Sequence, residues 1–202
     1  MSDSYHFARS LSAHFARAGA VSDEQAMRLW QHYELLTRWN RILNLTGIRT
    51  MEEAIVRHYC ESLFVGLHLP PEPVSVIDLG SGSGFPGVPM AVLRPDCAVT
   101  LAECHLRKAA FLREATRDLP NIRIAAQRAE SIEAAFDWVV SRAVAWKQLR
   151  KHAARLGRTV ALLLSRADAE SVRSSPGFSW RPPVPLPWGR QSVLLVGTGC
   201  FT

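Results

Sequence analysis

The sequence predicts an α/β protein in which a parallel sheet, with helices on both faces, follows an N-terminal helical cap. Up to about residue 70, apolar residues recur at intervals of three and four. From Val74 onward, short apolar or β-branched runs alternate with stretches of helical spacing. Such alternation is typical of βαβ units and so of a parallel sheet. We therefore expect a cap over residues 1–70 and a main domain over residues 71–202.

Three helices are expected in the cap, each marked by an apolar face or by a capping pair. The markers are Phe7, Leu11 and Phe15 for the first, Ser22 and Gln25 with a periodic face to Leu43 for the second, and Thr50 and Glu53 for the third. Pro70 and Pro71 end the third helix, since proline cannot continue it. Asn40 and Asn44 are expected to cap or bridge the end of the second helix.

Six short runs are expected to form the strands of the main domain. They are residues 74–79, 98–103, 122–127, 136–141, 159–164 and 192–197. A helix is expected over residues 107–119, and a proline-rich stretch over residues 181–187 precedes the last strand. Trp138 lies on an apolar run and is expected in the core, whereas Trp180 and Trp188 lie among prolines and suit packing or base stacking equally.

Length and composition exclude several classes of protein. With 202 residues, 48% of them apolar, the chain is neither disordered nor a disulfide-stapled miniprotein. Its apolar runs fall far short of the roughly 20 residues of a membrane helix, and no secretory signal is visible. Cysteine pairs with zinc spacing are absent, so we expect no metal and a reducing, cytoplasmic location. We also expect a monomer. Cys60, Cys97 and Cys104 are expected to be buried packing residues.

The net charge of +6 lies entirely beyond residue 70. Residues 1–70 carry seven basic and seven acidic side chains, and the rest of the chain carries 17 and 11. Arginine outnumbers lysine 21 to 3, which favours planar contacts to phosphates and bases. A basic run extends from Arg142 to Arg173. It is interpreted either as a nucleic-acid surface or as an ordinary solvated face.

The most informative stretch is a glycine-rich turn after the first expected strand, V-S-V-I-D-L-G-S-G-S-G-F-P-G over residues 74–87. A nicotinamide fingerprint needs a glycine where Phe85 stands, and no P-loop lysine follows. Asp78, two residues before Gly80, would repel a pyrophosphate but suits a cationic ligand with an amino acid headgroup. Glu103, at the end of the second strand, can accept both hydroxyls of a ribose. The alternative is a tight turn beside an ordinary surface glutamate.

Asp78, the glycines and Glu103 together resemble the class I S-adenosylmethionine (SAM) methyltransferases, which have a Rossmann-like sheet. Shorter motifs narrow the resemblance, above all W-N-R-I-L-N-L-T at residues 39–46 and G-F-P-G-V-P at residues 84–89. Over residues 20–145 the chain resembles the RsmG family, also called glucose-inhibited division protein B. Members of that family methylate N7 of a guanosine in bacterial 16S rRNA.

The resemblance implies SAM as cofactor and 16S rRNA, or the small ribosomal subunit, as partner. It implies a cofactor site formed by Asp78, Gly80, Ser81, Gly82, Gly84, Phe85, Glu103, Ala129, Glu130 and Arg142. The expected substrate-facing residues are Arg128, Arg142 and Arg166. For Arg142, an ion pair with an acid such as Asp137 is the competing interpretation. His58 is interpreted as a hydrogen-bonded histidine beneath the loop.

One departure from the family pattern concerns the expected fifth strand. The family usually has lysine followed by glycine where this chain has Leu164 and Ser165, so Arg166 would have to substitute for the lysine. This departure keeps two alternatives open, namely a SAM-binding, RNA-associated factor without methyl transfer and a methyltransferase acting on another substrate. N7 of guanine has a free lone pair, so no general base is expected. Phe85, Trp146 and Arg142 are the candidates for stacking on the base.

Overall fold

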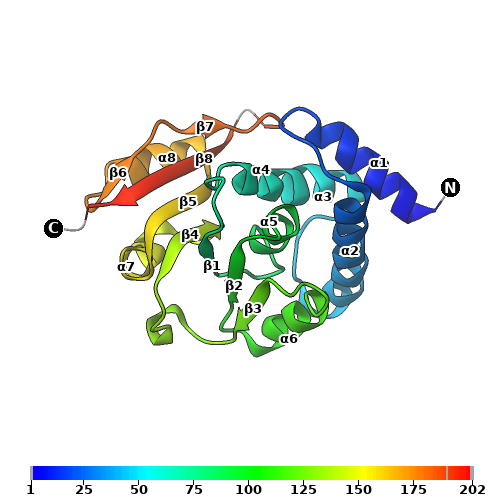
Figure 1. Ribbon diagram of the computed structural model, residues 1–202, viewed down its shortest axis with the longest axis horizontal. Coiled ribbons are helices and arrows are strands. Elements are labelled where there is room, and N and C mark those ends of the chain that lie inside the picture. Colours follow the sequence, from blue (N-terminus) through cyan, green and yellow to red (C-terminus); the bar gives the residue numbers. More distant parts are fainter. Residues whose placement is uncertain (1, 190, 201–202) are drawn as a thin grey trace.

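The computed structural model describes residues 2–189 and 191–200. The N-terminal part contains α1 (Asp3–Phe15), α2 (Asp23–Leu43), α3 (Met51–Ala54), the π-helical segment η1 (Ile55–Cys60) and α4 (Glu61–Leu67). These helices lie together beside α5 (Gly87–Leu93) (Figure 1). Among the described residues, no helix combines the length and the apolar character that crossing a membrane requires.

An eight-stranded sheet forms the centre of the molecule, in the order β3-β2-β1-β4-β5-β8-β6, with β7 paired to β8. The strands are β1 (Ser75–Leu79), β2 (Ala98–Ala102), β3 (Ile122–Ala125), β4 (Phe136–Arg142), β5 (Gly157–Ser165), β6 (Phe178–Trp180), β7 (Val184–Pro185) and β8 (Ser192–Gly199). The first five strands are parallel, as predicted. The last predicted strand, over residues 192–197, is confirmed as β8, which runs antiparallel to β5, a direction that the sequence patterns did not specify. The sequence patterns also did not reveal β6 and β7.

Successive side chains along the strands point alternately into two hydrophobic clusters, one on each face of the sheet. Val76 belongs to the cluster that includes the N-terminal helices, α5 and α6 (Leu106–Ala115). Ile77 belongs to the cluster with α7 (Trp146–Leu156) and α8 (Arg166–Arg173). The N-terminal helices therefore share a core with one face of the sheet, and the boundary near residue 70 stays a prediction.

Capping contacts define the ends of α2. Ser22 and Gln25 form both hydrogen bonds of a capping box. At the other end, Asn44 has a left-handed backbone with φ 48°. The side chain of Asn40 brackets Thr46, accepting from its backbone nitrogen at 2.8 Å and donating to its carbonyl oxygen at 3.0 Å. The predicted bridge at the end of this helix is confirmed.

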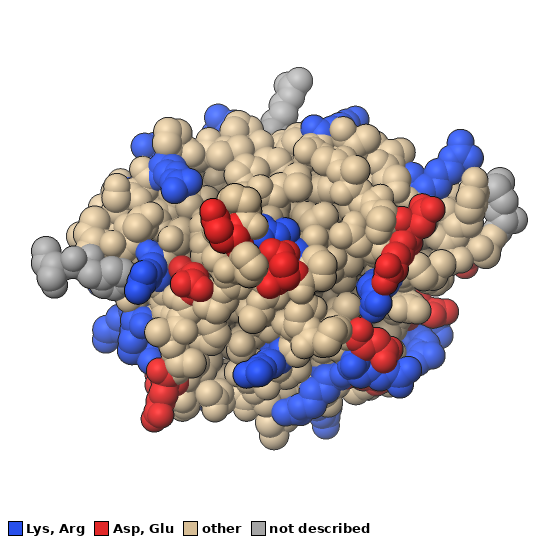
Figure 2. Space-filling view, in the orientation of Figure 1, with Lys and Arg blue, Asp and Glu red and all other residues tan. Residues whose placement is uncertain are grey.

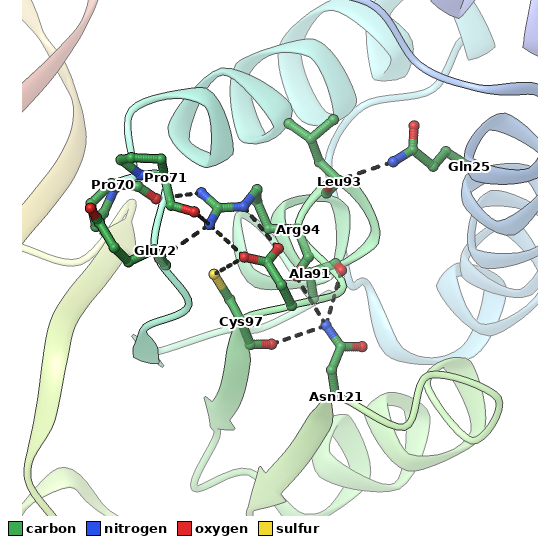
Figure 3. A network of polar contacts seen from close by, with 10 residues as sticks. Gln25, Pro70, Pro71, Glu72, Ala91, Leu93, Arg94, Cys97 and Asn121 are labelled. Carbon is green, nitrogen blue, oxygen red and sulfur yellow. Dashed lines mark hydrogen bonds and ion pairs between the residues drawn. The ribbon is translucent and has the colours of Figure 1, made fainter.

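A polar network ties the segment between α4 and β1 to the turn that follows α5 (Figure 3). Arg94 donates to the carbonyl oxygen of Pro70 at 2.8 Å and to the carboxylate of Asp96 at 2.7 Å. Asn121 donates to three carbonyl oxygens of the same turn, those of Ala91, Arg94 and Cys97. This network precedes β2 and β3, at the edge of the sheet where their amino ends lie, and it is a structural element.

A second tie joins the C-terminal part to α1. The indole nitrogen of Trp188 donates to the carbonyl oxygen of His14 at 2.8 Å. Its ring stacks on Phe15 with centroids 6.0 Å apart. Trp188 therefore packs in the fold, and Trp138 lies in the core as predicted, with 8% of its surface exposed.

Candidate cofactor and substrate site

The glycine-rich turn lies at the carboxyl end of β1, where the backbone needs glycine. Gly80, Gly82 and Gly84 have φ values of +78°, +55° and +91°. Residues other than glycine rarely adopt these backbone conformations. The amide nitrogens of Gly80 and Ser81 both donate to the carbonyl oxygen of Ala102, at 3.0 and 3.1 Å. The turn is therefore anchored to the end of β2.

Glu103 holds the same turn from the end of β2. One of its carboxylate oxygens accepts from the backbone nitrogen of Gly82 at 3.0 Å, and the other accepts from that of His105 at 2.8 Å. A carboxylate has about four acceptor positions, so both oxygens keep a lone pair for further donors. Only 8% of the residue's surface is exposed. The geometry therefore suits a residue that shapes the turn and also accepts hydroxyl groups.

Asp78 lies beneath the turn with no exposed surface. Its Oδ2 accepts from the backbone nitrogen of Gly87 at 2.9 Å, whereas its Oδ1 has no hydrogen-bond partner among the described residues. Burial raises the pKa of this carboxyl to about 7. A buried acceptor without a partner next to the turn is the kind of group that an ammonium or a bridging water satisfies. Direct contact between Asp78 and a headgroup stays a prediction.

Phe85 supports the turn with its ring. The ring stacks on His58 with centroids 4.5 Å apart and meets the rings of His32 and Tyr59 edge-on. Only 5% of the residue is exposed. The expectation that Phe85 stacks on a substrate base is therefore wrong for this structure, because aromatic neighbours already cover the ring. Its backbone still belongs to the turn.

His32 is a residue of the site that sequence reasoning missed. From α2 its Nδ1 lies 2.8 Å from the hydroxyl of Tyr59, and its Nε2 lies 3.1 Å from the carbonyl oxygen of Ser83. Because a carbonyl only accepts, Nε2 carries the proton and Nδ1 accepts from the hydroxyl. Burial lowers the pKa of His32 to about 4. The available signal was its spacing between Leu29 and Leu36 on an otherwise apolar face.

Arg142, at the end of β4, is held by two side chains from the N-terminal helices. Its Nη1 donates to Nδ1 of His58 at 2.9 Å, and its Nη2 lies 3.3 Å from Oε2 of Glu61. His58 also contacts the hydroxyl of Thr46 at 2.8 Å. An acid does pair with Arg142, but it is not Asp137, which accepts instead from the backbone and hydroxyl of Ser75.

His58 is neutral in this arrangement. Arginine can only donate, so Nδ1 of His58 accepts and Nε2 carries the proton toward Thr46. Burial and the charge of Arg142 lower the pKa of His58 to about 3. The interpretation of His58 as a hydrogen-bonded histidine beneath the loop is confirmed.

A cavity of about 980 Å³ opens at the carboxyl ends of β4 and β5. Basic, acidic and aromatic side chains line it, including Arg57, Glu61, Arg142, Trp146, Lys147 and Arg150. This cavity adjoins the glycine-rich turn, because Val144 lines the cavity and a Cβ atom at Gly80 would lie only 2.7 Å from its side chain. The cavity and the glycine-rich turn are therefore neighbours on one edge of the sheet.

The residues at the end of β5 do not supply the expected cation. Leu164 and Ser165 line the cavity. Arg166 begins α8 and lines two smaller depressions instead, one of them beside Trp188 and the other beside Arg173. Arg166 therefore does not line this cavity, and its expected role toward the substrate in place of the family lysine stays a prediction.

The basic run from Arg142 to Arg173 is not one surface. Lys147 and Arg150 line the cavity, whereas Arg158 is the second residue of β5, at the opposite edge of the sheet. Arg155 donates to the carbonyl oxygens of Ala129 and Ile132. Figure 2 shows a further group of basic side chains over α6 and the adjoining end of α2.

Arg155 thereby fixes the short helix η2 (Ala129–Ser131), which follows β3 and contains two of the predicted cofactor residues. Glu130 lies 3.5 Å from His152 of α7, and Arg128 is exposed just before η2. The positions of Ala129 and Glu130 beside an adenine, and of Arg128 toward substrate, stay predictions.

Two further expectations concern tryptophan and cysteine. Trp146 lines the cavity but packs edge-on against Phe178 and Trp180, so one part of its ring is covered. Cys60 and Cys97 are buried as predicted, whereas Cys104 is exposed, which contradicts its expected packing role. The described residues contain no group of metal-ligating side chains.

Comparison with known proteins identifies a family model and curated relatives that match much of the chain. The family model described as GidB, rRNA small subunit methyltransferase G, matches residues 25–167. A ribosomal RNA small subunit methyltransferase G of Nitrosomonas eutropha is 33% identical over 189 residues, which cover 87% of each chain. That of Nitrosomonas europaea is 44% identical over 120 residues, which cover 57% of this chain and 55% of the relative. The match thus spans little more than half the length of this second relative.

Solved structures of other methyltransferases share the fold. The magnesium protoporphyrin IX methyltransferase of Synechocystis PCC 6803, solved with bound SAM, superposes with a TM-score of 0.62 and 16% identity, covering 90% of this chain and 99% of that one. A putative RNA methyltransferase of Pyrococcus horikoshii gives a TM-score of 0.56 and 15% identity, covering 84% and 99%. At such low identity these matches establish the Rossmann-like fold and nothing more specific.

Proposed function

The chain belongs to the GidB family of small-subunit rRNA methyltransferases, and from this premise we propose that it transfers a methyl group from SAM to N7 of a guanosine in bacterial 16S rRNA. The observation that carries the proposal is the carboxyl edge of the sheet. There a turn with three left-handed glycines, held by Glu103, adjoins a cavity lined by basic residues. Ligands of open α/β sheets bind at this edge.

The residues of the turn fit SAM in three respects. Both oxygens of Glu103 keep acceptor positions for ribose hydroxyls. A Cβ atom at Gly82 would meet nothing nearer than 3.8 Å, so one face of the turn is open. Asp78 contributes a buried acceptor without a partner. We assign the cofactor site to these residues and to Gly80, Ser81, Gly84 and the backbone of Phe85.

When bound, SAM supplies an electrophilic methyl group, so that the bond from N7 to the methyl carbon forms as the carbon–sulfur bond breaks. No proton leaves N7, because its lone pair is free at neutral pH. The chain then needs to bind and align rather than to abstract a proton, and alignment contributes about 7–11 kcal/mol in well-oriented reactions. Neutral His32 and His58, both engaged in internal hydrogen bonds, suit such a mechanism.

Isothermal titration with SAM tests the cofactor site. Glu103→Ala should weaken SAM binding about tenfold or more, since hydrogen bonds to a charged group contribute about 1.5–3 kcal/mol. Glu133→Ala, which removes an exposed glutamate near β4, is the control and should bind like the unmodified protein. Unchanged affinity in Glu103→Ala would refute the ribose assignment.

Labelled SAM and 30S subunits from cells that lack the modification test the reaction. Labelled N7-methylguanosine in the 16S rRNA is the expected product. Leu164 lines the cavity at the position where the family usually has lysine. This difference favours a second candidate function, a SAM-binding, RNA-associated factor without methyl transfer. That candidate predicts SAM binding without label in any RNA. We also propose that the protein is a cytoplasmic monomer. Light scattering of the purified protein tests its oligomeric state.

A further inference from the structure

A buried acid in the cavity wall has no role in the mechanism described so far. Glu61 begins α4 directly after the π-helical segment η1, and its side chain is only 10% exposed. It lines the cavity beside Arg142. Burial of a carboxylate is costly unless the charge is paired, and Nη2 of Arg142 provides that pair at 3.3 Å. His58 in turn holds the other end of the guanidinium at 2.9 Å.

The carboxylate of Glu61 has acceptor capacity beyond this ion pair. It offers about four acceptor positions, of which Arg142 uses one and the hydroxyl of Ser192 uses another. A ligand with two adjacent donors would complement the remaining positions. Among the four RNA bases, only guanine presents two adjacent donors, N1–H and the N2 amino group, on its Watson–Crick edge. Enzymes that act on an extruded base read it along this edge.

We propose that Glu61 recognises the target guanine by accepting hydrogen bonds from N1–H and the N2 amino group inside this cavity. The proposal rests on the proposed function and names the residue that selects its substrate base. N7 lies on the edge of the purine ring opposite to N1 and N2. A guanine held in this way leaves N7 free on the side away from Glu61.

The same contact favours the reaction as well as the base. Methylation at N7 makes the base cationic, which makes N1–H more acidic. The hydrogen bond to a carboxylate therefore strengthens as the methyl group arrives, and an interaction that is stronger in the transition state accelerates the step. The negative charge of Glu61 also stabilises the positive charge that develops on the base.

A second carboxylate in the cavity wall fits this role less well. Asp168 is exposed, and its Oδ2 already accepts from the hydroxyl of Ser165 at 2.6 Å. It belongs to the first turn of α8, which Ser165 caps. Asp168 therefore provides a matched control from the same cavity, and Glu133, exposed elsewhere, provides a control for the loss of one negative charge.

Base recognition is measured by fluorescence anisotropy with dye-labelled uridine heptamers that carry one central guanosine or inosine. Inosine lacks only the N2 amino group. We expect the unmodified protein to bind the guanosine oligomer about tenfold more tightly than the inosine oligomer, in keeping with the discrimination of a bidentate contact. The affinities of Glu61→Gln for the two oligomers should differ by no more than about twofold. The NH2 group of glutamine is a donor, and it would face the N1–H or N2 amino donor of the guanine.

The controls Glu133→Gln and Asp168→Asn should keep the tenfold ratio. The proposal is overturned if the unmodified protein does not distinguish the oligomers, if Glu61→Gln keeps the ratio, or if Asp168→Asn loses it. Should Glu61→Gln not fold, Glu61→Asp withdraws the carboxylate by one methylene and should reduce the ratio below threefold, an unchanged ratio again overturning the proposal. Methyl transfer to 30S subunits is scored separately, so loss of the proposed function and loss of base recognition are distinguishable results.

Discussion

Arg142 at the end of β4 donates to Nδ1 of His58 at 2.9 Å, although 84 positions separate the two residues in the chain. The ring of His58 stacks at the same time on Phe85 in the glycine-rich turn. One neutral imidazole thus connects the turn to the cavity. The segment η1, which carries His58, therefore positions residues that follow two neighbouring strands, β1 and β4, at the same edge of the sheet.

Replacement of His58 should therefore destabilise the fold through a lost acceptor. His58→Phe keeps a ring beside Phe85 but leaves Nη1 of Arg142 without its partner, which costs about 1–3 kcal/mol for a largely buried donor. His58→Asn keeps an acceptor and should cost less. Urea denaturation followed by circular dichroism measures both, with His105→Phe, at an exposed position, as the control. Equal stability of His58→Phe and the unmodified protein would contradict the role assigned to this contact.

Local patterns predicted the fold well where the signal lay within one element. Ser22 with Gln25 marked the start of α2, and the apolar run before Gly80 marked β1, because capping and period depend on neighbours in the chain. The direction of β8 could not be predicted in this way. An apolar run states that a strand is buried but not which strand it pairs with or in which direction.

In the candidate site, too, local sequence signals were informative, whereas contacts between distant parts of the chain could not be predicted. The glycines and Glu103 were found because they follow strand ends, a position readable from sequence. His32 was missed because its partner Ser83 lies 51 positions away, and Glu61 was missed because only the folded chain brings it to Arg142. The surroundings of Arg166 could not be predicted either, because the change from β5 to α8 at that residue has no clear signal in the sequence.

Alanine should destabilise the glycine-rich turn more at position 84 than at position 82. Gly84→Ala places a methyl group 2.7 Å from Val88 at a φ of +91°, and the combined clash and strain should cost about 3 kcal/mol or more. Gly82→Ala has room for the methyl group at a φ of +55° and should cost about 1–2 kcal/mol. Urea denaturation provides both values. Gly47→Ala, with open space around it, is the control, and equal costs at positions 82 and 84 would contradict the geometry of the turn.

Asp78 should make the protein less stable as the pH rises through neutrality. Its pKa is raised by burial from 3.8 to about 7, so the folded state binds the proton more tightly than the unfolded state. The stabilisation is complete below about pH 4 and is lost as the pH rises through about 7. Between pH 5 and pH 8 the loss amounts to about 3 kcal/mol.

Urea denaturation of the unmodified protein and of Asp78→Asn across this range isolates the contribution of Asp78. The variant should gain stability relative to the unmodified protein as the pH rises from 5 to 8. Asp137→Asn is the control, because hydrogen bonds from Ser75 lower the pKa of Asp137 below its ordinary 3.8, so its difference from the unmodified protein should not change between pH 5 and pH 8. A difference between Asp78→Asn and the unmodified protein that does not change with pH would show that Asp78 does not titrate in this range.

Binding of RNA should depend on salt through the basic residues of the cavity and not through every residue of the basic run. Each lost phosphate contact should reduce the slope of log K against log salt by about 0.7 for single-stranded RNA. Lys147→Ala and Arg150→Ala remove charges that line the cavity, so each should flatten the slope by about this amount. Arg158→Ala removes the same charge from the opposite edge of the sheet and should leave the slope unchanged. Anisotropy titrations with a uridine oligomer at several salt concentrations give the slopes. Equal flattening in all three variants would mean that RNA contacts the protein without regard to the cavity, and the edge of the sheet assigned to the substrate would then be wrong.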